Sequence, residues 1–364
     1  MTRHAAPDPL ERRGLIYPHG NRRPGPGELV EVASGILWLS MPLPFSLDHI
    51  NLWVLDGGDH WAVVDTGVAT PQVKEHWRAL FAGPLAGKPV GRVIVTHYHP
   101  DHIGLAGWLA RKWKVVPEVT RAEFFLARIL TLDVGDHPPE EVIAFYARHG
   151  WPEDMLRDLR CASWGGFARG VHPLPQGYRR LREGDRLRIG ARQWDIVVGS
   201  GHSPEHACLW CPDEAILISG DQVLPRITSN VSVYPTEPEA DPLGDWLDSI
   251  DHLRALAPHA LVLPAHNEPF IGLHARLDQL ATDHGRKLDA LRAAAAGKPL
   301  TAWDSFSTLF GRAIGEGERQ MATGEALAHL HWLARRGELV AEMDGGVVRF
   351  RPAGILQRCG AAPP

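Results

Sequence analysis

The feature that most constrains this chain is a short segment in which three histidines and one aspartate fall within six positions. The four residues are His97, His99, Asp101 and His102. They follow a β-branched apolar run at 93–95 and precede a helix-like stretch at 103–112, so they are predicted to lie in a strand-to-helix loop. Neutral imidazoles and ionised carboxylates are the usual ligands of zinc and its first-row neighbours. The segment therefore predicts half of a metal site.

Three further segments place a ligand-type residue directly after a predicted strand. His202 follows the strand expected at 194–198, Asp221 follows the one at 215–219, and His266 follows the one at 261–263. An α/β sheet usually places its functional site at the ends of its strands, so these side chains are expected to converge on the first four. A histidine-rich solvent loop, the alternative interpretation of the first segment, does not account for this repetition.

With these four segments the chain resembles the metallo-β-lactamase superfamily, whose signature is H-x-H-x-D-H followed by a separate His, Asp and His. The resemblance covers roughly residues 30–275. It implies an αββα sandwich and two divalent metal ions, with zinc expected and iron or manganese as alternatives. Position by position, it assigns His97, His99 and His202 to one metal, Asp101, His102 and His266 to the other, and Asp221 to a bridge between them.

The bridging aspartate favours one branch of that superfamily. The true zinc β-lactamases lack it, whereas glyoxalase II, other thioesterases, lactonases and metallo-nucleases are similar to this chain in carrying it. Two adjacent cations lower the pKa of a shared water toward ~7 and supply the hydroxide that attacks a carbonyl. Asp101 is expected to be the catalytic residue that hydrogen-bonds this hydroxide and passes a proton to the leaving group.

Two more residues are expected to support the ligands by hydrogen bonding. Asp65 lies in an Asp-Thr-Gly turn after a predicted strand, at a position where the family has an aspartate that holds a ligand histidine. His206 lies four residues after His202. The alternatives are a simple turn or cap for Asp65 and plain packing for His206.

The rest of the sequence predicts a tail, a catalytic domain with a helical insertion, and a C-terminal domain. Residues 1–28 are rich in Pro and Gly and lack apolar periodicity, which is typical of a mobile tail. Residues 29–284 form the catalytic domain, with a helical insertion at about 118–174 where apolar residues recur at spacings of three and four. Residues 285–364 show three helix-like stretches and a two-stranded ribbon, the pattern of a small winged-helix domain.

The distribution of charge along the chain limits the class of substrate. The chain carries a formal net charge of −5, but residues 285–364 hold 11 basic and 8 acidic residues, so the catalytic part is more acidic than the whole. An acidic surface is unfavourable for a polyanion, and nucleic acid is not an expected partner. Hydrolysis of an acyl thioester or related ester is the leading hypothesis, and a nuclease acting on RNA or DNA and a lactonase are the alternatives. Lactonases usually carry a tyrosine shortly after the bridging aspartate, where residues 222–225 here are Gln-Val-Leu-Pro.

Candidate substrate contacts come from the insertion and from the segment after Asp221. Phe125 and Trp164 are expected to line an apolar acyl site, and Arg226 is a candidate for binding an anionic carrier. The expected partner is a small (thio)ester, no membrane association is expected, and a homodimer is compatible with the sequence. Four cysteines without framework spacing, and no leader-like apolar run, favour the cytoplasm.

Overall fold

A computed structural model describes residues 8–44 and 47–354 of the 364-residue chain. The contacts within the chain divide it into two compact units. The first unit contains the residues up to 134, then 165–229 and 252–277, and the second contains 135–164, 230–251 and the residues from 278 onward. All seven candidate metal ligands belong to the first unit.

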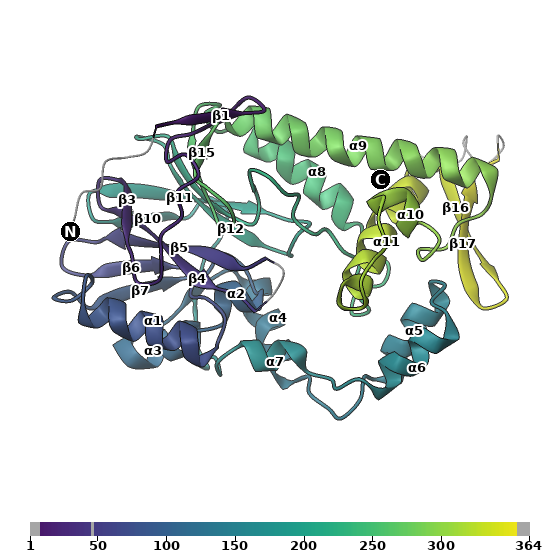
Figure 1. The fold of residues 1–364 in the computed structure, drawn as a ribbon, viewed down its shortest axis with the longest axis horizontal. Coiled ribbons are helices and arrows are strands. Elements are labelled where there is room, and N and C mark those ends of the chain that lie inside the picture. Colours follow the sequence, from purple (N-terminus) through teal and green to yellow (C-terminus); the bar gives the residue numbers. More distant parts are fainter. Residues whose placement is uncertain (1–7, 45–46, 355–364) are drawn as a thin grey trace. The chain divides into compact units, whose positions relative to one another are not determined.

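The first unit contains a seven-stranded sheet (Figure 1). In order across the sheet, its strands are β3 (Val30–Ala33), β4 (Ile36–Pro42), β5 (His49–Asp56), β6 (Trp61–Val64), β7 (Val90–Ile94), β8 (Glu118–Val119) and β9 (Arg179–Arg180). Pairing is antiparallel from β3 to β6 and parallel from β6 to β9.

A second sheet of the same unit has eight strands. Their order is β1 (Leu10–Arg12), β2 (Leu15–Tyr17), β15 (Phe270–Ile271), β14 (Leu261–Pro264), β13 (Ile216–Gly220), β12 (His206–Cys211), β11 (Arg192–Gly199) and β10 (Arg186–Ile189). Only β13 and β14 pair in parallel. The strands predicted before His202, Asp221 and His266 are thus confirmed as β11, β13 and β14.

Both faces of the seven-stranded sheet are buried. On β4, Ile36 and Trp38 pack in a cluster with Trp194 of the other sheet, and Leu37 and Leu39 pack in a second cluster with the helices α1 (Pro71–Ala82) and α3 (Ala106–Trp113). A strand that is buried on both faces needs apolar residues at successive positions, which explains why this sequence is a continuous apolar run rather than an alternating one. The rigid strands fix the loops that follow them.

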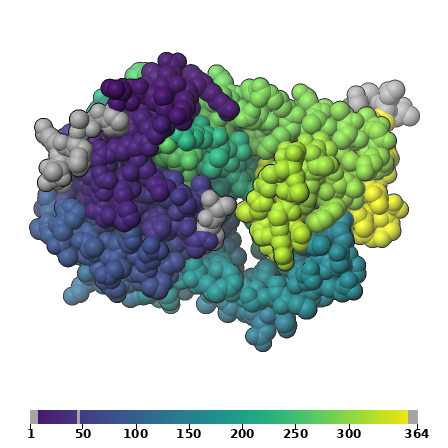
Figure 2. Space-filling view, in the orientation of Figure 1, coloured from purple at the N-terminus to yellow at the C-terminus, as the bar shows by residue number. Residues whose placement is uncertain are grey.

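The prediction of a mobile tail over residues 1–28 is wrong for residues 10–17. Residues 10–17 form the hairpin β1–β2, and Ile16 of β2 pairs with Ile271 of β15, which adds the hairpin to the eight-stranded sheet. Figure 2 shows this hairpin, in dark purple, on the surface of the first unit. Leu15 and Tyr17 are nevertheless buried. Strands of three residues are too short to show a periodic pattern, so they could not be recognised from the sequence. Residues 1–7 of that prediction lie outside the described residues.

The helical insertion contains the predicted helices, but these helices are divided between the two units. Its helices are α4 (Arg121–Leu132), α5 (Glu140–Arg148), α6 (Glu153–Cys161) and the short α7 (Gly166–Gly170). The helices α4 and α7 belong to the first unit, whereas α5 and α6 cluster with the C-terminal part of the chain in the second unit. Trp151, for example, contacts the ring of Trp303 and donates a hydrogen bond from Nε1 to Thr323 Oγ1 (2.8 Å).

The second unit also contains the predicted C-terminal helices and ribbon. Its further elements are most of α8 (Pro242–Leu253) and α9 (Leu273–Gly297), then α10 (Phe306–Phe310), α11 (Arg319–Arg335), β16 (Leu339–Asp344) and β17 (Val347–Pro352). The expected domain boundary at 284/285 falls inside α9, as does the division between the two units at 277/278. No helix in the described part of the chain is long and apolar enough to span a membrane.

Two buried histidines of the second unit form a hydrogen-bonded pair. His329 Nδ1 lies 2.8 Å from the carbonyl oxygen of Glu325, which can only accept, so the neutral ring carries its proton on Nδ1 and its Nε2 accepts a bond from His284 Nδ1 (3.1 Å). The pKa of His284 is lowered to about 2 and that of His329 to about 4, and burial is the largest cause of both shifts. Protonation of either ring therefore opposes folding.

This pair predicts acid destabilisation of the second unit. Both folded-state pKa values lie below the ordinary 6.5, so the unfolded chain binds more protons than the folded chain below that pH. The free energy of unfolding therefore falls as the pH is lowered from 6.5 to 4, by up to about 1.4 kcal/mol per pH unit for each histidine. We expect His284→Phe to flatten this slope in urea unfolding measured from pH 7 to 5. The same substitution at the exposed His259 should leave it unchanged; an equal effect of both variants would contradict the assignment.

Candidate metal centre

Four of the candidate ligands lie in the loop between β7 and α3. The chain leaves β7 at Ile94 and enters the single-turn helix α2 (Pro100–Ile103), in which Pro100 occupies the first turn and the amide of His102 donates to the carbonyl of His99 (2.9 Å). Proline suits the first turn of a helix because its missing N–H would have no partner there. The turn brings His99, Asp101 and His102 close to His97.

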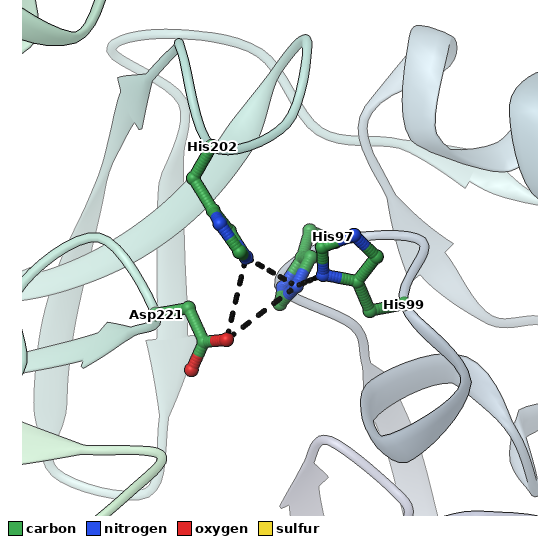
Figure 3. A group of neighbouring side chains, drawn as sticks. All are labelled: His97, His99, His202 and Asp221. Atoms are coloured by element: carbon green, nitrogen blue, oxygen red, sulfur yellow. Dashed lines mark hydrogen bonds and ion pairs between the residues drawn. The ribbon is translucent and has the colours of Figure 1, made fainter. Parts of the chain in front are cut away.

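One group of ligand atoms joins this loop to two others. It consists of His97, His99, His202 and Asp221, whose ligand atoms all lie within 4.8 Å of one another (Figure 3). His202 Nε2 lies 3.3 Å from both His97 Nε2 and Asp221 Oδ2, and His97 Nε2 lies 2.8 Å from His99 Nδ1. The side chains come from the loops after β7, β11 and β13, and their polar atoms face a common point.

A second group consists of Asp101, His102 and His266. Asp101 Oδ2 lies 3.6 Å from His102 Nε2 and 3.4 Å from His266 Nε2. Asp221 also reaches this group, with Oδ2 at 3.5 Å from His102 Nε2 and Oδ1 at 3.4 Å from His266 Nε2. The carboxylate of Asp221 therefore contacts ligand atoms of both groups.

The donor atoms fit divalent metal ions. Two of them, His102 Nε2 and Asp221 Oδ1, are buried without a hydrogen-bond partner among the described residues. A buried polar atom without a partner lowers the stability of the folded protein, and a bound metal ion would supply the missing partner. Four ligands at 2.0–2.1 Å from one tetrahedral ion lie about 3.3 Å from each other, and most of the separations above are close to this value. The set of five imidazoles and two carboxylates suits zinc, iron or manganese.

Burial and mutual contact set the protonation of these groups. Burial, followed by the neighbouring imidazoles, lowers the pKa of His97 far below its ordinary value, and burial lowers that of His99 to about 3. Burial raises the pKa of Asp101, but His102 and His266 lower it to about 2 overall. Burial lowers the pKa of His102 and of His266, but the carboxylates of Asp101 and Asp221 raise both above the ordinary value overall. At neutral pH the site thus offers ionised carboxylates and, at His97 and His99, neutral imidazoles, which are forms that bind metals.

Asp65, expected from the sequence to hold a ligand histidine, contacts His102 and the start of the ligand loop. Its Oδ2 lies 2.8 Å from His102 Nδ1 and accepts a hydrogen bond from Thr96 Oγ1, and its Oδ1 accepts one from the Thr96 amide (both 2.8 Å). Asp65 has a φ of +61°, a left-handed conformation that aspartate tolerates better than most residues. The carboxylate orients the His102 ring so that Nε2 faces the ligand cluster.

His206 also contacts the ligands. Its Nε2 accepts a hydrogen bond from the amide of Asp221 (3.0 Å), and its ring stacks on that of His97 with centroids 4.8 Å apart. The ring of His266 is oriented by a backbone group instead, because its Nδ1 lies 3.0 Å from the carbonyl oxygen of His49. These contacts hold one face of the cluster rigid.

The three candidate substrate contacts have different environments. Arg226 forms an ion pair with Glu268 (2.7 Å), so part of its charge is already neutralised. Phe125, on α4, is half exposed and lies against Tyr178. Trp164 belongs to the second unit, whereas the candidate ligands belong to the first.

Two buried residues that support the site are absent from the sequence prediction. Asn51 donates from Nδ2 to the carbonyl of Pro264 (3.0 Å), two residues before His266. Glu123 accepts hydrogen bonds from two of the loops that carry ligands. A glutamate on the apolar face of a predicted helix is unusual, and this could have marked Glu123 as a paired buried acid; nothing comparable marked Asn51.

Comparison with known proteins agrees with this geometry. The sequence profile of the metallo-beta-lactamase superfamily matches residues 46–266, and the profile described as metallo-beta-lactamase-like, C-terminal domain matches residues 288–353. The chain therefore belongs to the metallo-β-lactamase superfamily, and its first unit has the mixed α/β fold of that superfamily.

Three individual proteins are informative. A crystal structure of a beta-lactamase domain protein from Burkholderia ambifaria is similar with a TM-score of 0.86 and 43% identity, covering 93% of this chain and 98% of that one. A probable metallo-hydrolase of Bacillus subtilis, YqjP, is 23% identical over 87% of this chain and 97% of its own length. The acyl-coenzyme A thioesterase MBLAC2 of Gallus gallus is 28% identical over 66% of this chain and 80% of its own length.

The two ligand groups predict how much metal the protein binds. We expect about two ions per chain, and we expect Asp221→Ala to lose metal because its removal leaves two cations close together with less charge between them. Elemental analysis after growth with ample metal measures both quantities. The matched control is Asp213→Ala, which removes an exposed carboxylate from the turn between β12 and β13. One ion or none in the wild-type protein would contradict the prediction.

Proposed function

We propose that this protein is a dinuclear metal-dependent hydrolase that cleaves acyl thioesters or related esters. The observation that carries the proposal is the position of Asp221, whose carboxylate contacts both groups of candidate ligands. Membership of a metallo-hydrolase superfamily supports hydrolysis. The similarity to an acyl-coenzyme A thioesterase supports the thioester as the bond that is cleaved.

The metals and the chain have separate roles in this proposal. Two divalent cations would be held by His97, His99, His202, Asp101, His102, His266 and Asp221, and they would supply Lewis-acid polarisation and an acidified water. Asp101 is ionised at neutral pH, so its free carboxylate oxygen can accept the proton that water loses as it adds to the carbonyl carbon. The C–S bond then breaks and a thiolate leaves without strong acid assistance, and the proton held by Asp101 passes to the departed sulfur to give the thiol.

Several finer assignments belong to the same proposal. Zinc is the proposed metal, with iron or manganese as alternatives, and the site is proposed to resemble that of glyoxalase II-like thioesterases. The C-terminal helices and ribbon are proposed as a winged-helix module that does not bind nucleic acid, and the protein is proposed to act in the cytoplasm. Phe125 and Trp164 remain proposed contacts of the acyl group and Arg226 of an anionic carrier.

Comparing substrates of different classes on one metal-loaded preparation tests the reaction. We expect kcat/KM for a medium-chain acyl thioester to exceed that for a matched lactone and for a phosphodiester by at least about tenfold, or ~1.4 kcal/mol in transition-state binding. Asp221→Ala should abolish the activity and Asp213→Ala should not, which excludes a contaminating hydrolase. Faster cleavage of RNA than of the thioester would establish the nuclease alternative, and faster lactone opening would establish the lactonase.

A further inference from the structure

One buried carboxylate connects two of the loops that carry candidate ligands. Glu123, in the first turn of α4, is fully buried. Its Oε2 accepts a hydrogen bond from the amide of Tyr98 (2.9 Å), and its Oε1 accepts one from the amide of Glu205 (2.7 Å). Tyr98 lies between His97 and His99, and Glu205 follows His202 by three residues.

Further hydrogen bonds join the segment that contains Glu205 to the start of α4. The side chain of Glu205 accepts a hydrogen bond at Oε2 from the amide of Ala122 (2.9 Å), and Thr120 Oγ1 donates to the carbonyl of Glu205 (2.7 Å). Glu123 of α4 thus binds the backbone of the loop after His202, and Glu205 of that loop binds the backbone at the start of α4. The amides of helix starts have no partner within the helix, so Glu205 also satisfies one of these donors.

We propose that Glu123 is a positioning residue that sets the spacing of His97 and His99 relative to His202. Its carboxylate oxygens accept from backbone amides of the two loops, so it acts through their backbone. A single carboxylate with two acceptor oxygens holds both amides at once. The inference rests on the metal-binding part of the proposed function.

The substitution Glu123→Gln tests this role with little change in shape. The amide oxygen of glutamine can accept from one of the two loops, but its NH₂ group cannot accept from the other, so one loop loses its attachment. We expect amide hydrogen exchange at Tyr98 or Glu205 to accelerate at least about tenfold in the metal-free protein, and the metal dissociation constant to rise by about 10- to 100-fold.

The matched control is Glu118→Gln. Glu118 is also a buried glutamate, but it accepts hydrogen bonds from Arg92 (2.6 and 2.5 Å) and not from a ligand loop. This variant should lose stability without a change in metal affinity or in exchange at Tyr98 and Glu205. Equal loss of affinity in both variants, or unchanged exchange in Glu123→Gln, would overturn the proposal. If the wild-type protein binds no metal the proposed function fails, and the exchange measurement still decides whether Glu123 holds the loops.

An independent observation concerns a cavity in the second unit. A cavity of about 730 Å³ lies among α6, α10, the segment after α9 and the start of α11. It is large enough for an organic ligand. Its walls combine apolar and charged side chains, among them Met155, Lys298, Trp303, Asp304, Phe306 and Arg319.

Hydrogen-bond donors in this cavity exceed the acceptors available to them. Arg319 donates from Nη1 to the thioether sulfur of Met155 (2.7 Å) and pairs with no carboxylate among the described residues. The ammonium of Lys298 lies 3.9 Å from Asp304, whose other oxygen already accepts from Thr301. The indole N–H of Trp303 has no acceptor in the described part of the chain. A guanidinium that is left with a sulfur acceptor is available to an anion.

We infer that this cavity binds an organic anion, with its phosphate or carboxylate at Arg319 and Lys298 and its apolar or aromatic body against Trp303 and Phe306. The charge of the donors selects the anionic group, and the rings of Trp303 and Phe306, with centroids 5.0 Å apart, offer flat apolar surface to the body of the ligand. Inorganic phosphate would satisfy only the charged half of this site.

Calorimetric titration of the whole protein tests the inference. The probes are adenosine 3′,5′-bisphosphate for a nucleotide source, octanoate for a fatty-acid source and inorganic phosphate as the bare anion. At least one organic probe should bind saturably, at least tenfold more tightly than inorganic phosphate. Arg319→Gln should weaken that binding at least tenfold, whereas Arg349→Gln, which lies on the ribbon outside the cavity, should not.

The outcomes separate this site from the metal centre. Binding should persist in Asp221→Ala, because the cavity lies in the other unit. Binding of the nucleotide alone would identify a phosphate-bearing ligand, and binding of octanoate alone a fatty carboxylate. No saturable binding, equal binding of inorganic phosphate, or no effect of Arg319→Gln would overturn the inference, and none of these results depends on hydrolytic activity.

Discussion

The contact of the Asp221 carboxylate with imidazoles from three separate loops is the interaction on which the site depends. Burial, followed by the neighbouring imidazoles, lowers the pKa of His97 far below its ordinary value. Asp221 and Asp101 provide the negative charge that makes the cluster a site for cations. The buried ends of the strands supply the rigidity that keeps such unfavourable groups close together.

This rigidity comes from sheets that are covered on both faces. The strands β7 and β13 end next to the cluster, and their apolar side chains are locked in the clusters between the sheets and under the helices. The loops themselves are polar, so they need additional attachments. Asp65 attaches the His102 ring, the His49 carbonyl attaches His266, and Glu123 attaches the backbone on both sides of the site.

The two units contain different candidate sites. All seven candidate metal ligands belong to the first unit. The second unit combines part of the insertion with the C-terminal helices and ribbon, and it contains the cavity with Arg319. A chain segment that crosses between units in this way couples their folding, because neither unit is a continuous stretch of sequence.

The sequence by itself determined the ligand set and the strands that carry it, because His97 to His102 are local and each later ligand directly follows an apolar run. The helices of the insertion were equally predictable from their periodicity. Only the tertiary structure decided the partners of Glu123 and Asn51, the hairpin at residues 10–17 and the division of the insertion between two units. Each of these depends on contacts between residues distant in sequence, and local pattern carries no information about which distant partner satisfies a buried polar group or a strand edge.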